Sequence, residues 1–235
     1  MRLYLALAFS LLFANAAHAY LPLPPAMIAL DSPAGQAMFL QSTARAAYWP
    51  LAAHYETQEN QAFCGIASLV MVLNSTGIAA PQPPGFVPYS FFTQDDIFPP
   101  NGATIFSADW IEHHGLTLDQ LGQIATHAGL AVQLVHATAD GLALFRTQAA
   151  TALASPGIYV IVNFRREALG EAGYGHISPL AAYDEKTDSF LILDVARYKY
   201  PPAWVSAKDL YAALDTPDPG NGNQTRGYLV VTAPK

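Results

Sequence analysis

Cys64 is the residue of this sequence best suited to covalent chemistry, and it is the single cysteine among 235 residues. A thiol acts as a nucleophile when its pKa is lowered and a base and oxyanion donors stand beside it. Cys64 opens the apolar run 64–73, whose helical spacing predicts a buried helix. The positive end of such a helix favours a thiolate. Gln58, six residues earlier, offers an amide N–H that would form an oxyanion hole with the backbone N–H of Cys64.

His176 and Asp194 are the matching base and orienting acid. They lie in two predicted strands, 176–184 and 189–196, which flank a turn near Lys186. In such a hairpin, residues whose numbers sum to about 370 face each other, as these two do. The carboxylate would fix the imidazole tautomer and stabilise the imidazolium. The chain order Cys, His, Asp is similar to that of papain-like enzymes, with Asp in place of the more usual Asn.

Each of these residues also has an ordinary structural interpretation. A lone Cys is often a small core residue, and a His in a strand is often merely hydrogen-bonded. One Cys excludes an internal disulfide framework and a Cys-cluster metal site. The adjacent His113 and His114 do not share a helix face, so no dedicated metal site is expected.

The elements that must position these side chains are mainly helices in the first part of the chain and mainly strands in the later part. Periodicity and capping patterns predict helices over 33–46, 64–73, 118–128 and 140–152, with a helical turn at 107–112. Strands are expected at 132–136, 157–164, 176–184, 189–196 and 226–232. This order indicates an α+β fold with a mainly antiparallel sheet. We expect a helical lobe at about 31–153 and a sheet lobe at about 156–232.

The N-terminal segment 1–19 reads as a secretory signal peptide. Arg2 precedes an apolar run that is too short to cross a bilayer, and Ala17-His18-Ala19 has the small-x-small pattern of a cleavage site. Cleavage would leave 20–235 as a single catalytic domain, exported to the periplasm or secreted. An uncleaved anchor is the alternative. No later segment is apolar over a membrane-spanning length.

The composition excludes several classes of protein. Charged residues are 12% and hydrophobic residues 52% of the chain, which argues against disorder. The formal net charge is −7, from 11 Lys and Arg against 18 Asp and Glu. An acidic chain without basic clusters is a poor partner for nucleic acid or an anionic membrane.

Three stretches resemble the phytochelatin synthase (glutathione γ-glutamylcysteinyltransferase) family: "TQENQAFCGIASLVMVLN", "GYGHISPLAAYD" and "LILDVARYKYPPAWV". The resemblance covers roughly residues 35–232. It implies a papain-like fold and attack of a cysteine on the Cys–Gly bond of glutathione, with release of glycine. The γ-glutamylcysteinyl thioester then passes to water, giving γ-glutamylcysteine, or to a second glutathione, giving phytochelatin.

The resemblance also implies a role for each matching residue. Cys64 matches the nucleophile, His176 the base, Asp194 the orienting acid and Gln58 the oxyanion glutamine. By the same resemblance, Arg166 and Arg226 match arginines of the family that engage substrate carboxylates. A guanidinium group suits such ligands because it binds a carboxylate through two hydrogen bonds. The alternative is that either Arg is an exposed residue that only aids solubility. Gly65 and Gly175 are expected to border the substrate.

The expected partners are glutathione and its metal complexes. No cofactor is required for acylation, and Cd, Zn or Cu would act as glutathione thiolate complexes that serve as acceptor. The resemblance is to the short bacterial form without a Cys-rich C-terminal region, in which hydrolysis dominates. A homodimer is left open. Two other functions remain: a papain-like peptidase or amidase acting on other γ-glutamyl or leader peptides, and a non-catalytic binding protein for glutathione or its metal complexes.

Overall fold

A seven-stranded antiparallel sheet forms the centre of the computed structural model, which describes residues 20–98 and 106–233. The predicted signal peptide 1–19 lies outside the described residues. The strands follow the spatial order β1 (Ile28–Ala29), β6 (Ala203–Ser206), β5 (Ser189–Ile192), β4 (Gly175–Asp184), β3 (Ile158–Arg165), β7 (Gly227–Thr232) and β2 (Ala131–His136). The α+β class expected from the sequence is therefore confirmed.

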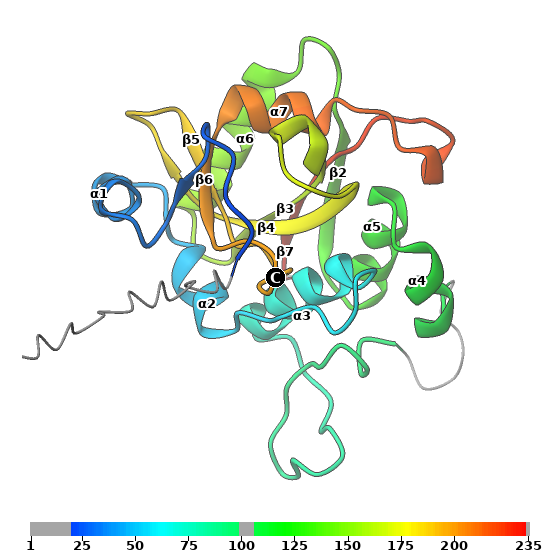
Figure 1. Cartoon of the computed structure of the whole chain (residues 1–235). Helices are drawn as coiled ribbons and strands as arrows, with labels where there is room; N and C mark the ends of the chain where they lie inside the picture. The colour runs from blue at the N-terminus through cyan, green and yellow to red at the C-terminus, as the bar shows by residue number, and fades with distance from the viewer. Residues whose placement is uncertain (1–19, 99–105, 234–235) are drawn as a thin grey trace, which may run out of the picture.

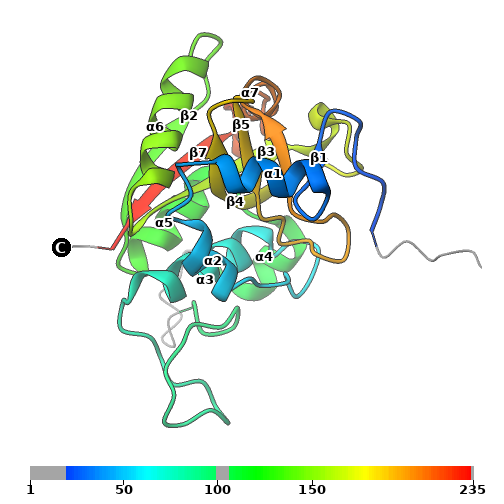
Figure 2. The ribbon, with the colours of Figure 1, turned by 90° about the vertical axis from the view of Figure 1, so that its left-hand side faces the viewer.

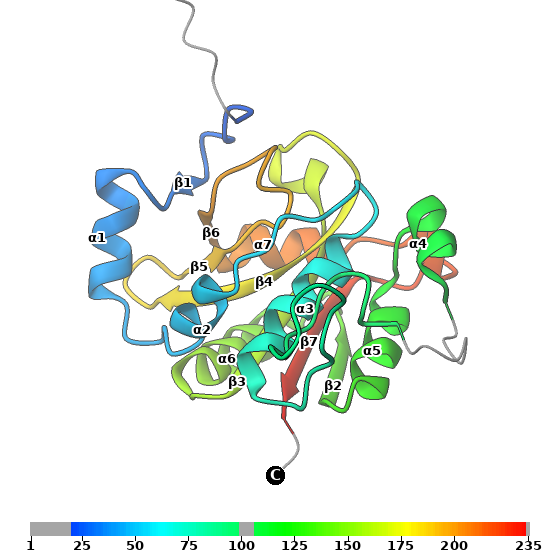
Figure 3. The same cartoon turned by 90° about the horizontal axis from the view of Figure 1, so that it is seen from below.

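Helices cover both faces of this sheet. They are α1 (Pro33–Gln41), α2 (Tyr48–Ala53), α3 (Cys64–Thr76), α4 (Ala108–His114), α5 (Leu118–His127), α6 (Leu142–Ala154) and α7 (Ala207–Leu214), with short 3₁₀ turns η1 (Arg166–Leu169) and η2 (Pro219–Asn221). In Figure 1, α6 and α7 lie above the sheet and α3 lies below it. The view turned by 90° about the vertical axis shows the same layers (Figure 2), and from below α3 crosses in front of the central strands (Figure 3).

Helix α3 is the central element of the lower layer. Its first ten residues, 64–73, are all buried, which explains why the run is apolar all round. The helix packs on β4 and also contacts α2, α5 and β3. Gly77 ends it in the left-handed conformation at φ 73°, which glycine adopts without a side-chain penalty. The helix thus holds its first residue rigidly against the sheet.

The β4–β5 hairpin is real, but its register differs from the predicted one. Leu180 pairs with Ile192 and Asp184 with Ser189, so facing numbers sum to 372–373 rather than about 370. An irregularity between Leu180 and Ala182 inserts an extra residue into β4. Strand β5 also ends at Ile192, so Asp194 follows the strand instead of lying within it.

Several element boundaries also differ from the sequence-based expectations. The helix predicted over 33–46 ends at Gln41, because the chain turns extended at Ser42 and the backbone O of Ala44 accepts a hydrogen bond from Tyr183 N. The sheet takes β2 from the stretch expected to be the helical lobe, 31–153, whereas helix α7 lies in the stretch expected to be the sheet lobe, 156–232. The two-lobe division remains a sequence-based prediction. None of the helices described here is long and apolar enough to cross a bilayer.

Gly227→Ala is expected to destabilise the sheet where β7 passes β2. A Cβ at Gly227 would lie 2.0 Å from the backbone O of Val135, and a paired backbone cannot move aside cheaply. We expect a loss of about 1–3 kcal/mol in the free energy of unfolding, measured by urea denaturation. Gly220→Ala is the control, since its new carbon meets nothing nearer than 3.4 Å. Equal stability of the two variants would contradict the close approach.

Candidate active site

Cys64 is the first residue of α3 and is 8% exposed. Burial by itself would raise the pKa of the Cys64 thiol. The hydrogen bond and charge of His176 outweigh that penalty, the backbone N–H of Ile177 and the charge of Arg166 assist, and the net pKa is lowered. Phe63, the residue before the helix, gives no side-chain cap to its first turn. Cys64 therefore has the environment of an activated thiol.

His176 lies in β4 and faces the thiol. Its Nε2 stands 2.9 Å from Asp194 Oδ1 and 2.9 Å from Ser178 Oγ, which leaves Nδ1 for Cys64. The ring packs edge-on to Phe164, with centroids 5.5 Å apart. Burial is the largest single influence and lowers the pKa of His176, but the charge and hydrogen bond of Asp194 and the hydrogen bond of Cys64 together raise it by more, so the net pKa is raised. The site thus lowers the pKa of the thiol and raises the pKa of the imidazole.

Asp194 is buried just beyond β5 and accepts bonds from three groups. Besides His176, Arg166 Nη2 lies 2.9 and 2.7 Å from its two oxygens, and the backbone N of Ala196 donates over 2.8 Å. Burial raises the pKa of Asp194, yet the charges and hydrogen bonds of His176 and Arg166 hold it well below the usual range. Asp194 is therefore ionised and fixed in orientation. The structure brings the three residues predicted as the catalytic set into one site.

Gln58 is buried close to this site. Its backbone N donates to Val195 O, and its Nε2 donates to Asn60 O over 2.7 Å and to Tyr198 Oη over 3.2 Å. Its Oε1 is buried and has no hydrogen-bond partner among the described residues. The side chain is thus placed near the nucleophile with both amide hydrogens engaged. Its oxyanion role remains a prediction.

A cleft of about 720 Å³ opens over Cys64 and His176. Its walls come from the loop before α3, the end of α4, the start of β4 and the segment before β7. Arg226 lines this cleft although its side chain is buried, and its Nη1 donates to Thr216 Oγ1 and Pro217 O. The Arg226 Nε is buried and finds no acceptor among the described residues. Nη2 of Arg226 lies 3.5 Å from Asp218 Oδ1, so a ligand carboxylate that binds Nε would share this cation with Asp218.

The other predicted substrate-binding residues have different surroundings. Arg166 is 3% exposed and pairs with Asp194 and Glu171 instead of opening into the cleft. Gly65 faces Leu116 and Ile177, whose side chains would lie 3.1 and 3.3 Å from an added Cβ. Gly175 does line the cleft, and a Cβ added to it would lie 3.1 Å from Arg226 Nη2. A direct substrate contact stays a prediction for each of them.

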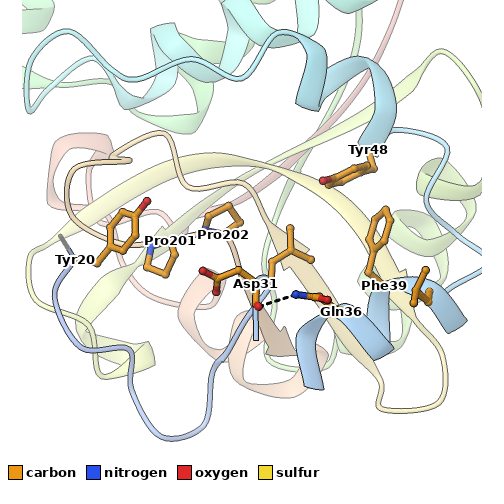
Figure 4. A pocket seen from close by; sticks show the side chains of 9 residues that line it. Tyr20, Asp31, Gln36, Phe39, Tyr48, Pro201 and Pro202 are labelled. Carbon is orange, nitrogen blue, oxygen red and sulfur yellow. Dashed lines mark hydrogen bonds between the residues drawn. The ribbon is translucent and has the colours of Figure 1, made fainter. Parts of the chain in front are cut away.

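A second pocket, of about 340 Å³, lies away from the thiol, between the N-terminal segment, α1 and the Pro201-Pro202 turn (Figure 4). Figure 4 shows Tyr20, Phe39 and Tyr48 around it, and Gln36 donating to the backbone O of Asp31. None of the predicted catalytic residues lines this pocket. The cleft above Cys64 is therefore the candidate active site.

Metal ligands do not gather within the described ranges: no group of three His, Cys, Asp or Glu side chains could hold an ion there. His113 and His114 line the cleft, but the Nδ1 of each is hydrogen-bonded to the backbone carbonyl four residues earlier. Their ring centroids lie 6.5 Å apart. The pair is thus part of a cleft wall made by α4.

The side chains of Ser178, Glu171 and Tyr198 belong to the site and were not singled out from the sequence. Ser178 Oγ lies 2.9 Å from His176 Nε2. Glu171 bonds Arg166 behind Asp194, and Tyr198 bonds Gln58 beside the thiol. Glu171 carried a weak signal, since a lone carboxylate in a glycine-rich loop five residues after an Arg suggests a local ion pair. Tyr198 carried none, because its partner lies 140 positions away.

Fold and site together show an α+β protein in which a buried cysteine, histidine and aspartate meet beneath a cleft. A family model described as "Phytochelatin synthase" matches residues 18–228. The chain belongs to the phytochelatin synthase family.

Individual relatives agree with this assignment. A protein named "Glutathione gamma-glutamylcysteinyltransferase 1" of Lotus japonicus is 34% identical over 219 residues, which cover 91% of this chain and 42% of that protein. The Schizosaccharomyces pombe protein "Glutathione gamma-glutamylcysteinyltransferase" is 31% identical over 89% of this chain and 50% of its own length. The chain thus spans about half or less of these relatives. A solved structure of a C39-like peptidase from Bacillus anthracis aligns over 77% of this chain and 95% of that chain, with 14% identity and a TM-score of 0.42.

Proposed function

We propose that the protein is a glutathione γ-glutamylcysteinyltransferase-like enzyme that cleaves the Cys–Gly bond of glutathione. The observation that carries the proposal is the buried arrangement of Cys64, His176 and Asp194 beneath a cleft, in a chain of the phytochelatin synthase family. A protein that only bound glutathione would have no use for a thiol with a lowered pKa.

In the proposed reaction, the Cys64 sulfur attacks the cysteinyl carbonyl carbon of glutathione. His176 gives its proton to the leaving glycine nitrogen, and a γ-glutamylcysteinyl thioester forms on Cys64. The backbone N–H of Cys64 and the amide of Gln58 stabilise the oxyanion. Gln58 provides this donor when its longer bond, 3.2 Å to Tyr198 Oη, is released.

The second half of the proposed reaction transfers the acyl group. His176 removes a proton from water, which yields γ-glutamylcysteine, or from the amine of a second glutathione, which yields phytochelatin. Heavy-metal ions enter this scheme as glutathione thiolate complexes, that is, as acceptor substrate. The cleft of about 720 Å³ gives room for the donor and part of an acceptor.

The test of this function is product analysis with glutathione. Purified protein is incubated with glutathione, with and without cadmium, and glycine, γ-glutamylcysteine and phytochelatin are quantified by mass spectrometry. We expect stoichiometric release of glycine in both conditions, with phytochelatin favoured by cadmium. Absence of glycine, together with cleavage of other γ-glutamyl peptides, would instead identify a peptidase with a different substrate.

Arg226→Gln is expected to raise the KM for glutathione ten- to a hundred-fold, because a charged hydrogen bond is worth about 1.5–3 kcal/mol. Arg226→Lys keeps the charge but loses the planar edge that carries the unpartnered Nε, so most of the loss should remain. Arg146→Gln is the control, since Arg146 lies on α6 and pairs with Asp188. Similar KM values for the three variants would remove Arg226 from carboxylate binding.

Export is a separate part of the proposal. It is supported by the apolar run after Arg2 and by the small residues at Ala17 and Ala19. Protein recovered from the periplasm or the medium of the expressing cell should begin at Tyr20 by N-terminal sequencing. A chain that retains residues 1–19 and sediments with membranes would indicate an anchor instead.

A further inference from the structure

Arg166 sits between two buried carboxylates behind the catalytic pair. Its Nη2 bonds both oxygens of Asp194, and its Nη1 bonds Glu171 Oε2 over 2.5 Å. The side chains of Arg166, Glu171 and Asp194 are 3%, 2% and 5% exposed. Buried charges of this kind persist only when each is compensated by a partner. Glu171 is the second counter-ion that allows Arg166 to stay there.

The five groups form one row of titratable side chains. The thiol of Cys64, the imidazole of His176 and the carboxylate of Asp194 are followed by the guanidinium of Arg166 and the carboxylate of Glu171. Glu171 ends the row on the side away from the thiol. Without its charge, Arg166 would interact more strongly with Asp194 and would compete with His176 for the shared Oδ1.

Other polar and charged side chains lie near this row, namely those of Tyr200, Lys199, Tyr55 and Tyr198. Tyr200 stacks below Arg166 at 5.2 Å and accepts a bond from Ala172 N, and Lys199 lies over the same ring at 5.9 Å. Tyr55 donates to the backbone O of Asp194. Tyr198, whose pKa is raised by burial, faces the thiol side. Among the described residues of this network, Glu171 is the only anion besides Asp194 that bonds Arg166.

We propose that Glu171 is a positioning residue that acts through Arg166 and Asp194 to hold the His176 imidazole and to set the pH range in which Cys64 is a thiolate. It touches neither substrate nor the reacting atoms. The inference rests on the proposed function only through the assignment of Cys64 as the reactive thiol.

The direction of the effect follows from the charges. Arg166 lowers the pKa of Cys64 and also lowers the pKa of His176. Burial raises the pKa of Glu171 while the charge of Arg166 lowers it, and above that pKa the Glu171 carboxylate offsets part of the positive charge of Arg166. Removing the Glu171 charge should therefore lower both values together. The window between the two titrations, in which thiolate and imidazolium coexist, should move to lower pH.

The experiment measures the rate at which iodoacetamide alkylates the protein from pH 4 to 10, without glutathione. Cys64 is the single cysteine, so alkylation of thiol, followed as loss of the free thiol, reports on Cys64 alone. In Glu171→Gln the rate–pH profile should move to lower pH by about half a unit to one unit, the size expected for one unit charge acting at partly buried distances. Glu167→Gln is the matched control, because Glu167 belongs to η1 but pairs with Arg165 at the surface. Its profile should coincide with that of the unmodified protein.

A conservative variant, Glu171→Asp, tests whether the charge alone restores the rate–pH profile. Glu171→Asp keeps the charge and should return the profile toward that of the unmodified protein. A folded Glu171→Gln protein with an unshifted profile would overturn the proposal. If Glu171→Gln does not fold, Glu171→Ala is measured in its place, with the same acid shift expected, and an unshifted profile in that folded variant overturns the proposal. Glycine release is assayed in parallel, so a shifted profile in a protein inactive on glutathione would refute the proposed function and leave the role of Glu171 intact.

Discussion

Replacing Cys64 with serine is expected to lower glycine release from glutathione by about ten-thousand-fold or more, as removal of a catalytic nucleophile generally does. The hydroxyl lacks the low pKa that His176 gives to the thiol, although it fills nearly the same space. The thermal midpoint should change little because the helix and its packing are retained. Mass spectrometry after mixing with glutathione should find an acyl adduct in the unmodified protein and none in the variant.

Ser75→Ala on the same helix is the control for this comparison. Ser75 lies at the far end of α3, where its hydroxyl donates to Met71 O. Its glycine release should match that of the unmodified protein. Persistence of full activity in Cys64→Ser would refute the nucleophile assignment, whatever the behaviour of the control.

Asp194→Asn is expected to reduce both activity and stability. A neutral amide holds the wrong imidazole tautomer, and the corresponding change in another catalytic triad costs about ten-thousand-fold in kcat. The variant also leaves Arg166 with Glu171 as its remaining anion, and breaking a buried ion pair costs about 3–5 kcal/mol. Steady-state kinetics and urea denaturation measure the two effects. Asp188→Asn is the control, since that carboxylate pairs with the partly exposed Arg146 and should affect neither strongly.

The stability effect of Asp194 has a definite pH dependence. Its pKa is lowered on folding, so its ionised form stabilises the folded state fully above the unfolded value of about 3.9 and progressively less as pH falls toward the folded value. The stability difference between the unmodified protein and Asp194→Asn should therefore shrink as pH falls below about 4. A difference that grows in acid would contradict the lowered pKa.

The catalytic set could be predicted because its signals are local or nearly so. Cys64 opens an apolar run with helical spacing, and the hairpin that carries His176 and Asp194 is short. The pairing register could not be predicted, because the extra residue between Leu180 and Ala182 depends on how β4 bends over the core. The Asp194 carboxylate still reaches His176, since Asp194 follows the strand and is free of its alternation.

Other parts depend on contacts between distant segments. The strands β1 and β6 are two and four residues long, too short for periodicity to be read, and they form because β6 pairs with β5 and β1 pairs with β6. Helix α7 did have a readable start, with Ser206 capping Asp209 N, but its partners lie far away in the chain. Arg166 illustrates the same limit at the site: its type suggested a ligand for substrate, whereas the fold gives it two protein carboxylates.

The place of β7 in the sheet has a consequence for the order in which the protein can fold during synthesis. Strand β2 pairs with β7 and with no other described strand, and β7 is the last strand of the chain. Until β7 has left the ribosome, both edges of β2 are unpaired, and β3 lacks its neighbour β7. Long-range pairings of this kind slow folding and prolong the exposure of aggregation-prone edges. The nascent chain therefore needs residues 227–232 before the sheet that carries His176 can be completed.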